Sequence, residues 1–125
     1  MPSKKLPFLF LTLYVLLLYK KNTMKNLSQE AWISAIAATE NAVIIDVRTP
    51  EECAGGIVEN ALMLDFFKSE FFRQEIEQLD KSKMYFVYCR SGHACTIMED
   101  MGFPETVNLL GGMNAWSAPK VMPNL

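Results

Sequence analysis

Short apolar runs alternate with mixed polar and apolar segments through most of this chain. The runs that fit buried strands occupy residues 42–47, 61–64, 84–88 and 106–110. Each is apolar throughout or nearly so, which is typical of strands that are covered on both faces. Strands of this kind, separated by short helical segments, predict an α/β domain with a mainly parallel central sheet flanked by helices.

The first helix is expected to begin just after Leu27. Ser28 is a favourable N-cap, and Leu27 before it can pack onto Trp32 one turn into the helix. The expected inner face consists of Trp32, Ile33, Ile36 and Ala37.

A second, shorter helix is predicted after the strand at 42–47. Thr49 and Glu52 have the spacing of a capping box, and Pro50 occupies the first helical position between them. Gly55 and Gly56 end this helix, so Cys53 lies within it and is expected to pack inward.

Two further helices follow in the second half of the chain. Asp65 can cap the first of them, and the second is expected over residues 94–101 before the stop signal at Gly102. The expected inner face of the helix after Asp65 consists of Phe67, Phe71, Ile76 and Leu79, widened by Phe66 and Phe72. Gly111 and Gly112 then lead into a short closing helix near Trp116.

Residues 1–23 differ in character from the predicted domain, which we place at 24–125. Leu6 to Tyr19 carries no charge and has a lysine pair on each side. As a helix this run spans about 21 Å, which is short of a bilayer core of roughly 30 Å. Three interpretations stay open: translation from Met24 giving a cytoplasmic protein, a membrane anchor, or an export signal that lacks a small-x-small cleavage site.

Composition narrows the function classes. The formal net charge of the 125 residues is −2, so no basic surface suggests a nucleic-acid partner. The cysteines are Cys53, Cys89 and Cys95, and His93 is the only histidine. An odd number of cysteines without Cys-x-x-Cys spacing makes both a disulfide framework and a zinc site improbable, and it fits a reducing compartment best.

Cys89 has the sequence context of a nucleophile. It directly follows the buried run Met84 to Tyr88, and a short polar loop with one glycine leads from it into the next helix. The carboxyl end of a parallel strand is where open α/β sheets bind ligands. Loop amides and a helix N-terminus both favour negative charge, so they would lower the pKa of the Cys89 thiol.

Three segments in this order resemble the rhodanese-like domain family. They are Val43-Ile44-Ile45-Asp46-Val47-Arg48-Thr49-Pro50-Glu51-Glu52, Tyr88-Cys89-Arg90-Ser91-Gly92, and Gly102-Phe103 followed by Val107-Asn108-Leu109-Leu110-Gly111-Gly112-Met113-Asn114-Ala115-Trp116. Together they cover nearly all of the chain from Leu27 to Trp116. The resemblance implies a three-layer α/β fold with a mainly parallel sheet.

The resemblance also implies sulfur transfer through a persulfide on Cys89, the catalytic residue. Donors would be small sulfur anions such as thiosulfate or another persulfide, and acceptors would be cyanide or a small or protein thiol. The amides of Arg90, Ser91, Gly92, His93 and Ala94 would cradle the terminal sulfur, with Arg90 steering anions and His93 tuning the site or donating to it. Asp46 and Arg48 would support the loop, and no metal or organic cofactor is required. A membrane contact is implied only if residues 1–23 are retained.

The loop also departs from the family pattern. Active members commonly carry a second arginine five residues after the cysteine, where this chain has Ala94. The segment from Cys89 to Gly102 is also shorter than the family pattern by about one helical turn. The alternative function is therefore a catalytically inactive rhodanese fold that serves as a binding or regulatory module.

Cys95 leaves two further hypotheses open. Cysteine phosphatases of related fold carry an arginine six residues after the cysteine, and this chain has Cys95 there, which makes phosphatase activity improbable. Cys95 could instead be a resolving thiol that forms a disulfide with Cys89. The competing interpretation is a small buried helix residue.

Overall fold

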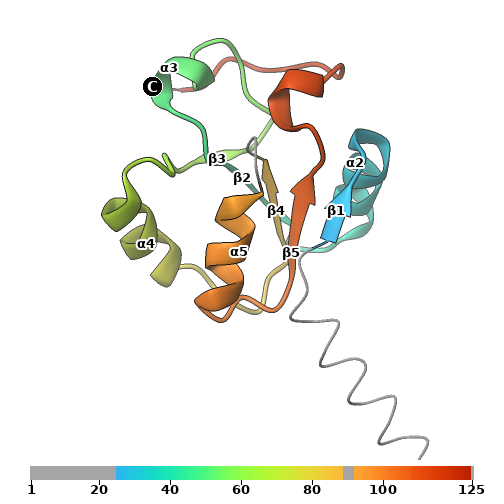
Figure 1. The fold of residues 1–125 in the computed structure, drawn as a ribbon. Helices are drawn as coiled ribbons and strands as arrows, with labels where there is room; N and C mark the ends of the chain where they lie inside the picture. Colours follow the sequence, from blue (N-terminus) through green and yellow to red (C-terminus); the bar gives the residue numbers. More distant parts are fainter. Residues whose placement is uncertain (1–24, 89–91, 125) are drawn as a thin grey trace, which may run out of the picture.

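A computed structural model describes residues 25–88 and 92–124 (Figure 1). Its strands are β1 (Lys25–Leu27), β2 (Val43–Asp46), β3 (Leu62–Met63), β4 (Tyr85–Tyr88) and β5 (Thr106–Leu109). Its helices are α2 (Gln29–Ala38), α3 (Pro50–Cys53), α4 (Ser69–Glu77), α5 (His93–Asp100) and the 3-10 helix η1 (Gly112–Ala115). Strands and helices alternate along the chain, as the apolar pattern predicts.

The five strands form one parallel sheet in the order β1-β5-β4-β2-β3. This confirms the predicted α/β class, and it places β4, which leads into Cys89, at the centre of the sheet. The edge strand β1 was not predicted, because Lys25-Asn26-Leu27 has neither an apolar run nor an alternating pattern. Its partner β5 lies near the other end of the chain, and Asn26 pairs there with Asn108.

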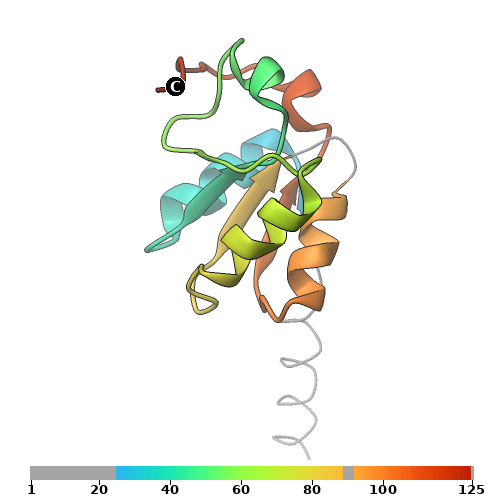
Figure 2. The ribbon, with the colours of Figure 1, turned by 90° about the vertical axis from the view of Figure 1, so that its left-hand side faces the viewer.

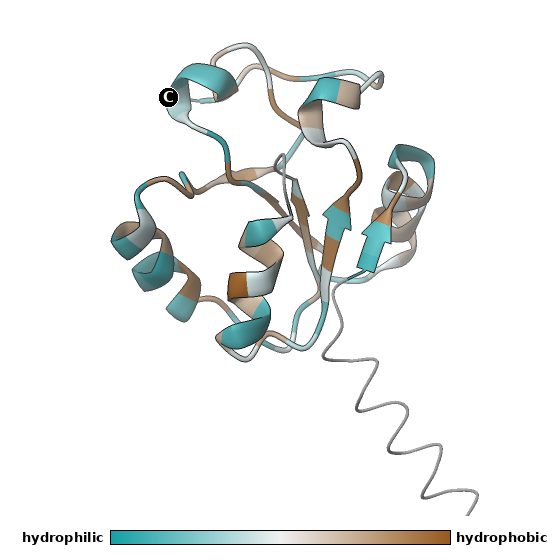
Figure 3. Ribbon diagram, in the orientation of Figure 1, coloured by the Kyte–Doolittle hydropathy of each residue, from teal (hydrophilic) through white to brown (hydrophobic). Residues whose placement is uncertain are grey.

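Helices cover both faces of the sheet, which gives three layers (Figure 2). On one face α4 and α5 pack onto Tyr85 and Val87 of β4. On the other face Trp32 of α2 packs onto Phe86 and Tyr88, the alternate residues of the same strand. Both faces of β4 are therefore buried, whereas the edge strand β1 is hydrophilic and exposed except at Leu27 (Figure 3).

The predicted helix starts at Ser28 and Thr49 are confirmed. The Ser28 hydroxyl accepts a hydrogen bond from the backbone N–H of Ala31 at 3.3 Å. Thr49 and Glu52 form the complete capping box that begins α3, with Pro50 in its first turn. Cys53, the last residue of this helix, is buried as expected.

Two predicted inner faces are partly wrong. Asp65 does not cap α4, because its carboxylate accepts from the N–H of Phe67 and the helix begins only at Ser69. The later start turns Phe67 outward, to 78% exposure, and leaves Phe71 half exposed, while Phe72 and Ile76 form the buried face. In α2 only Trp32 is fully buried, and the predicted inner residues Ile33 and Ala37 are exposed.

The leader predictions concern residues 1–23, which lie outside the described part of the chain. Within residues 25–88 and 92–124, no helix has both the length and the apolar character needed to cross a bilayer.

Candidate active site at the carboxyl end of the central strand

Asp46, a predicted supporting residue, is the last residue of β2, and its register partner Tyr88 is the last residue of β4. Strand β4 ends at Tyr88, and α5 begins five residues later at His93. Three of the predicted site residues, Cys89, Arg90 and Ser91, lie outside the described residues, so the prediction for them stays a prediction. The surroundings can be described from Tyr88 on one side and Gly92 on the other.

Gly92 precedes the first residue of α5 in the left-handed region, with φ of +71°. A glycine adopts this conformation without steric strain, and it lets the chain turn sharply into the helix. The Gly92 carbonyl accepts the N–H of Thr96 at 3.4 Å, which closes the first helical turn. The backbone amides of this first turn point toward the N-terminus of α5, where the positive end of the helix dipole lies.

His93 and Ala94 open this helix on opposite sides. The His93 side chain is exposed, and its ring lies 5.5 Å from that of Phe66, measured between centroids. Ala94 is fully buried in the core together with Cys95. The methyl group of Ala94 therefore packs away from solvent, and only its backbone amide remains a candidate donor. Burial of Cys95 fits a packing role, and its role as a resolving thiol stays a prediction.

Asp46 and Arg48 form an ion pair directly beside the end of β4. They are two residues apart in an extended segment, so their side chains share one face. Arg48 donates to both carboxylate oxygens, from Nε at 3.0 and 3.2 Å and from Nη2 at 2.8 Å. Asp46 is fully buried, and Arg48 is largely so. Such a two-pronged pair is the arrangement in which a buried carboxylate is best compensated.

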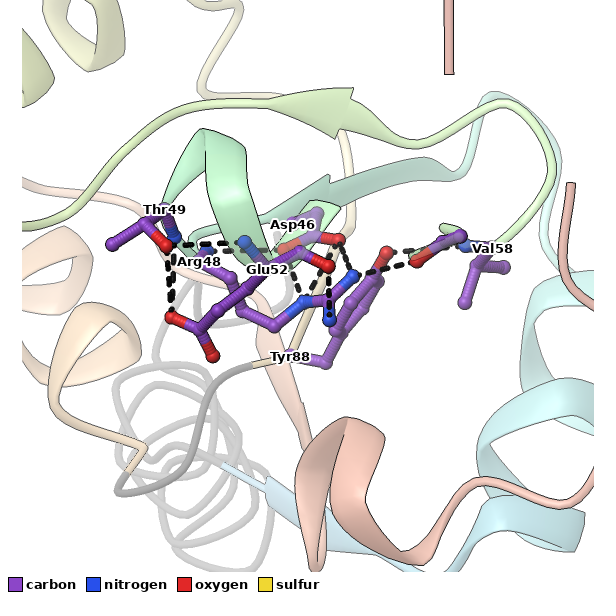
Figure 4. A network of polar contacts seen from close by, with 7 residues as sticks. Asp46, Arg48, Thr49, Glu52, Val58 and Tyr88 are labelled. Carbon is purple, nitrogen blue, oxygen red and sulfur yellow. Dashed lines mark hydrogen bonds and ion pairs between the residues drawn. The ribbon is translucent and has the colours of Figure 1, made fainter. Parts of the chain in front are cut away.

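The guanidinium of Arg48 also holds the segment around α3. It donates from Nη1 to the carbonyl of Glu52 at 3.3 Å and from Nη2 to the carbonyl of Gly56 at 2.8 Å. One side chain thus joins the end of β2 to the last turn of α3 and to the segment that follows it (Figure 4). These contacts reach the α3 segment, and the predicted support of the Cys89 loop by Asp46 and Arg48 stays a prediction.

Sequence reasoning missed Tyr88 as a member of this network. The Tyr88 hydroxyl accepts the N–H of Val58 at 3.1 Å, and the guanidinium carbon of Arg48 lies 5.6 Å from the ring centroid. Burial, a hydrogen bond to Asp46 and the charge of Asp46 raise the pKa of Tyr88, so the phenol stays protonated. The available signal was a buried tyrosine next to the candidate nucleophile, because a buried hydroxyl needs a partner.

Cys53 lies beside the same network. Burial is the main cause that raises the pKa of its thiol to about 11, and the nearby carboxylate of Asp46 adds to it. A thiol with this pKa is protonated at neutral pH and is a poor nucleophile.

A pocket of about 220 Å³ opens beside Cys53 at the carboxyl ends of β2 and β3, lined by Arg48, Pro50, Cys53, Met63, Asp65, Lys68 and Phe71. Among the described residues, no group of three or more His, Cys, Asp or Glu side chains could hold a metal ion.

Comparison with known proteins finds similarity to one family, both in sequence and in structure. The family model of the rhodanese-like domain matches residues 29–119. The chain is 37% identical over 97 residues to the "Putative sulfurtransferase YtwF" of Bacillus subtilis, covering 74% of this chain and 90% of that protein. It is 31% identical over 93 residues to the thiosulfate sulfurtransferase GlpE of Coxiella burnetii, covering 71% and 82%. A rhodanese-like domain protein from Staphylococcus aureus superposes with a TM-score of 0.61 at 26% identity, covering 75% of this chain and 92% of that one.

Proposed function

This chain belongs to the family of rhodanese-like domains, and on that premise we propose that it is a sulfurtransferase in which Cys89 carries the sulfur as a persulfide. Relatives that the chain covers almost from end to end are named sulfurtransferases, and one of them is named for thiosulfate. These names support the class of reaction. The choice of thiosulfate or a persulfide as donor is part of the proposal.

Cys89 carries the proposal through its described neighbours along the chain, the end of the central strand and the start of α5. It follows the last residue of the central strand, whose side chain is held by Asp46, Arg48 and Val58, and it precedes the N-terminus of α5 by four residues. A nucleophilic thiolate needs a lowered pKa and fixed donors for the anion it forms. Helix amides on one side and a braced strand on the other supply both requirements.

The chemistry is two displacements at sulfur. The Cys89 thiolate attacks the outer sulfur of thiosulfate, the sulfur–sulfur bond of the donor breaks, and sulfite leaves with the bonding electron pair. The enzyme now carries a persulfide anion, for which the amides of residues 90–94 are the proposed cradle, with Arg90 steering the anionic donor. An acceptor thiolate or cyanide then attacks the terminal sulfur and releases the Cys89 thiolate.

Intact-protein mass spectrometry after incubation with thiosulfate tests this proposal. The 125-residue protein should gain the mass of one sulfur atom, and Cys89→Ser should gain none. Cys53→Ser is the matched control, because it removes another thiol at this end of the sheet and should still take up sulfur. The adduct should disappear when cyanide or a small thiol is added, with thiocyanate or a persulfide as the product.

Absence of an adduct on folded wild-type protein would overturn the proposal. It would favour the alternative, an inactive rhodanese fold that acts as a binding or regulatory module. One specific feature supports this alternative. The position where active members commonly carry an arginine is occupied here by Ala94, which is buried.

A further inference from the structure

Tyr88 is the last described residue before Cys89, and its side chain is held on three sides. The ring is fully buried and meets Trp32 edge to face, with 6.0 Å between centroids. At its tip the hydroxyl accepts the N–H of Val58 at 3.1 Å and hydrogen-bonds to Asp46. The partners come from helix α2, from strand β2 and from the segment after α3, as the network in Figure 4 shows for Asp46 and Val58.

Strand pairing explains why the phenol faces the carboxylate. Asp46 and Tyr88 are register partners in the parallel pair of β2 and β4, so their side chains leave the same face of the sheet side by side. The carbonyl of Tyr88 is held as well, because it accepts the N–H of Val47 at 3.4 Å. Both the backbone and the side chain of Tyr88 are thus fixed relative to β2.

We infer that the hydroxyl of Tyr88 is a positioning group for the Cys89 nucleophile. This inference rests on the proposed function and deepens it. Consecutive Cα atoms are about 3.8 Å apart, so any shift of Tyr88 passes directly to Cys89. A displacement of about 1 Å at a reacting atom can lower a rate by roughly a hundredfold. The hydroxyl therefore affects catalysis by fixing the position of the Cys89 thiolate, and it does not itself contact substrate.

Tyr85 supplies a matched control on the same strand. It is as buried as Tyr88, at 1% exposure against 0%, and its hydroxyl donates to the carbonyl of Asp80 at 2.6 Å. It lies at the amino end of β4, away from the site, and faces the opposite side of the sheet. Tyr85→Phe and Tyr88→Phe therefore remove the same atom at opposite ends of one strand, the first from a partly buried hydrogen bond and the second from a buried one.

Steady-state transfer from thiosulfate to cyanide, measured on the full-length protein, tests the inference. Tyr88→Phe should lower kcat by about tenfold or more and leave the KM for thiosulfate within about twofold. Tyr85→Phe should change neither constant by more than about twofold. Equal kcat values in the two variants would overturn the inference, since hydroxyl loss would then act only on stability.

Alkylation of Cys89 by iodoacetamide, read by peptide mass spectrometry, separates this inference from the proposed function. The alkylation rate of Cys89 should fall in Tyr88→Phe and not in Tyr85→Phe, whether or not the protein takes sulfur from thiosulfate. Wild-type protein that alkylates at Cys89 but forms no persulfide would contradict the proposed function alone. Unchanged alkylation and unchanged kcat in Tyr88→Phe would contradict the positioning role alone.

A second variant decides the case if Tyr88→Phe does not fold. Asp46→Asn keeps the volume and an acceptor oxygen but removes the charge that orders both Tyr88 and Arg48. Folded Asp46→Asn protein with kcat lowered about tenfold or more would support the inference. Wild-type kcat in that variant would overturn it.

Discussion

The two tyrosines of β4 stand at opposite ends of one strand and are held in different ways. Tyr85 at the amino end donates to the backbone of Asp80, five residues earlier in the chain. Tyr88 at the carboxyl end accepts from Val58, thirty residues away, and packs beside an ion pair on a neighbouring strand. The first tyrosine closes a local turn, whereas the second joins segments that meet only in the folded protein.

The difference shows that the hydrogen-bonded, buried polar side chains around β4 lie mainly at its carboxyl end. The amino end of β4 has a short turn with an exposed aspartate, apolar core residues around Tyr85 and one buried threonine, Thr106, on the neighbouring strand. The carboxyl end has a buried carboxylate, a guanidinium with bonds to three residues and a phenol, and all of them surround the point where Cys89 follows. Buried polar networks of this kind are rigid when every member is satisfied.

The largest expected effect comes from placing an arginine where the family commonly has one. Ala94→Arg would place a charged side chain in a part of the core that solvent does not reach. We expect a loss of more than about 4 kcal/mol in the free energy of unfolding and no gain in sulfur transfer. Thr96→Arg is the control, since Thr96 is exposed on the same helix and should tolerate the change. Urea denaturation measures both, and a stable, more active Ala94→Arg protein would contradict this account of α5.

Removing the ion pair allows a direct comparison of the two ends of β4, because a matched substitution can be made at each end. Arg48→Ala leaves the carboxylate of Asp46 buried without its counterion, so we expect a loss of about 3 kcal/mol. Asp80→Ala at the amino end should cost far less, because the bond from Tyr85 goes to the Asp80 backbone and survives. Chemical denaturation of both variants checks the ranking. Similar losses would mean that the carboxyl end is no more interdependent than the amino end.

The smallest expected effect is an alkaline one, at Cys53. The pKa of this thiol is raised from its ordinary value near 9.0 to about 11, so the folded protein keeps a proton that the unfolded chain releases. The resulting stability is complete below pH 9 and is lost as the pH rises toward 11, by about 2 kcal/mol. Cys53→Ala should be less stable at neutral pH but should decline less between pH 9 and 11 in denaturation measurements. Parallel declines would show that Cys53 is not held as a dry thiol.

The sequence predicts the central part of this fold well. The apolar run at 84–88 predicts a buried strand and β4 covers Tyr85–Tyr88, and the capping box of Thr49 and Glu52 is confirmed. These features depend on local patterns, in which the apolar run or the cap carries its own signal. The same locality explains the errors at Phe67 and Phe71, because the pattern is equally apolar whether the helix begins at Asp65 or at Ser69.

The candidate site is only partly predictable in the same way. The spacing of Asp46 and Arg48 places both side chains on one face of a strand, so their pairing could be expected from the sequence. The link from Tyr88 to Val58 could not, because it depends on the register of β2 and β4 and on the path of the segment after α3. Burial of Ala94 likewise depends on how α5 lies across the sheet.

Pairing of β1 with β5 has a consequence for the order in which the domain assembles during synthesis. Asn26 needs Asn108 as its partner, so the first strand of the chain must wait until nearly the whole domain has been translated. Contacts between such distant residues form slowly, because a long loop must close before they form. Until then β5, which carries Val107 and Leu109, is an open edge, and such an edge can pair with the wrong chain. Where several ribosomes translate the same message close together, pairing of the three residues of β1 with β5 would prevent this edge from pairing with nascent chains nearby.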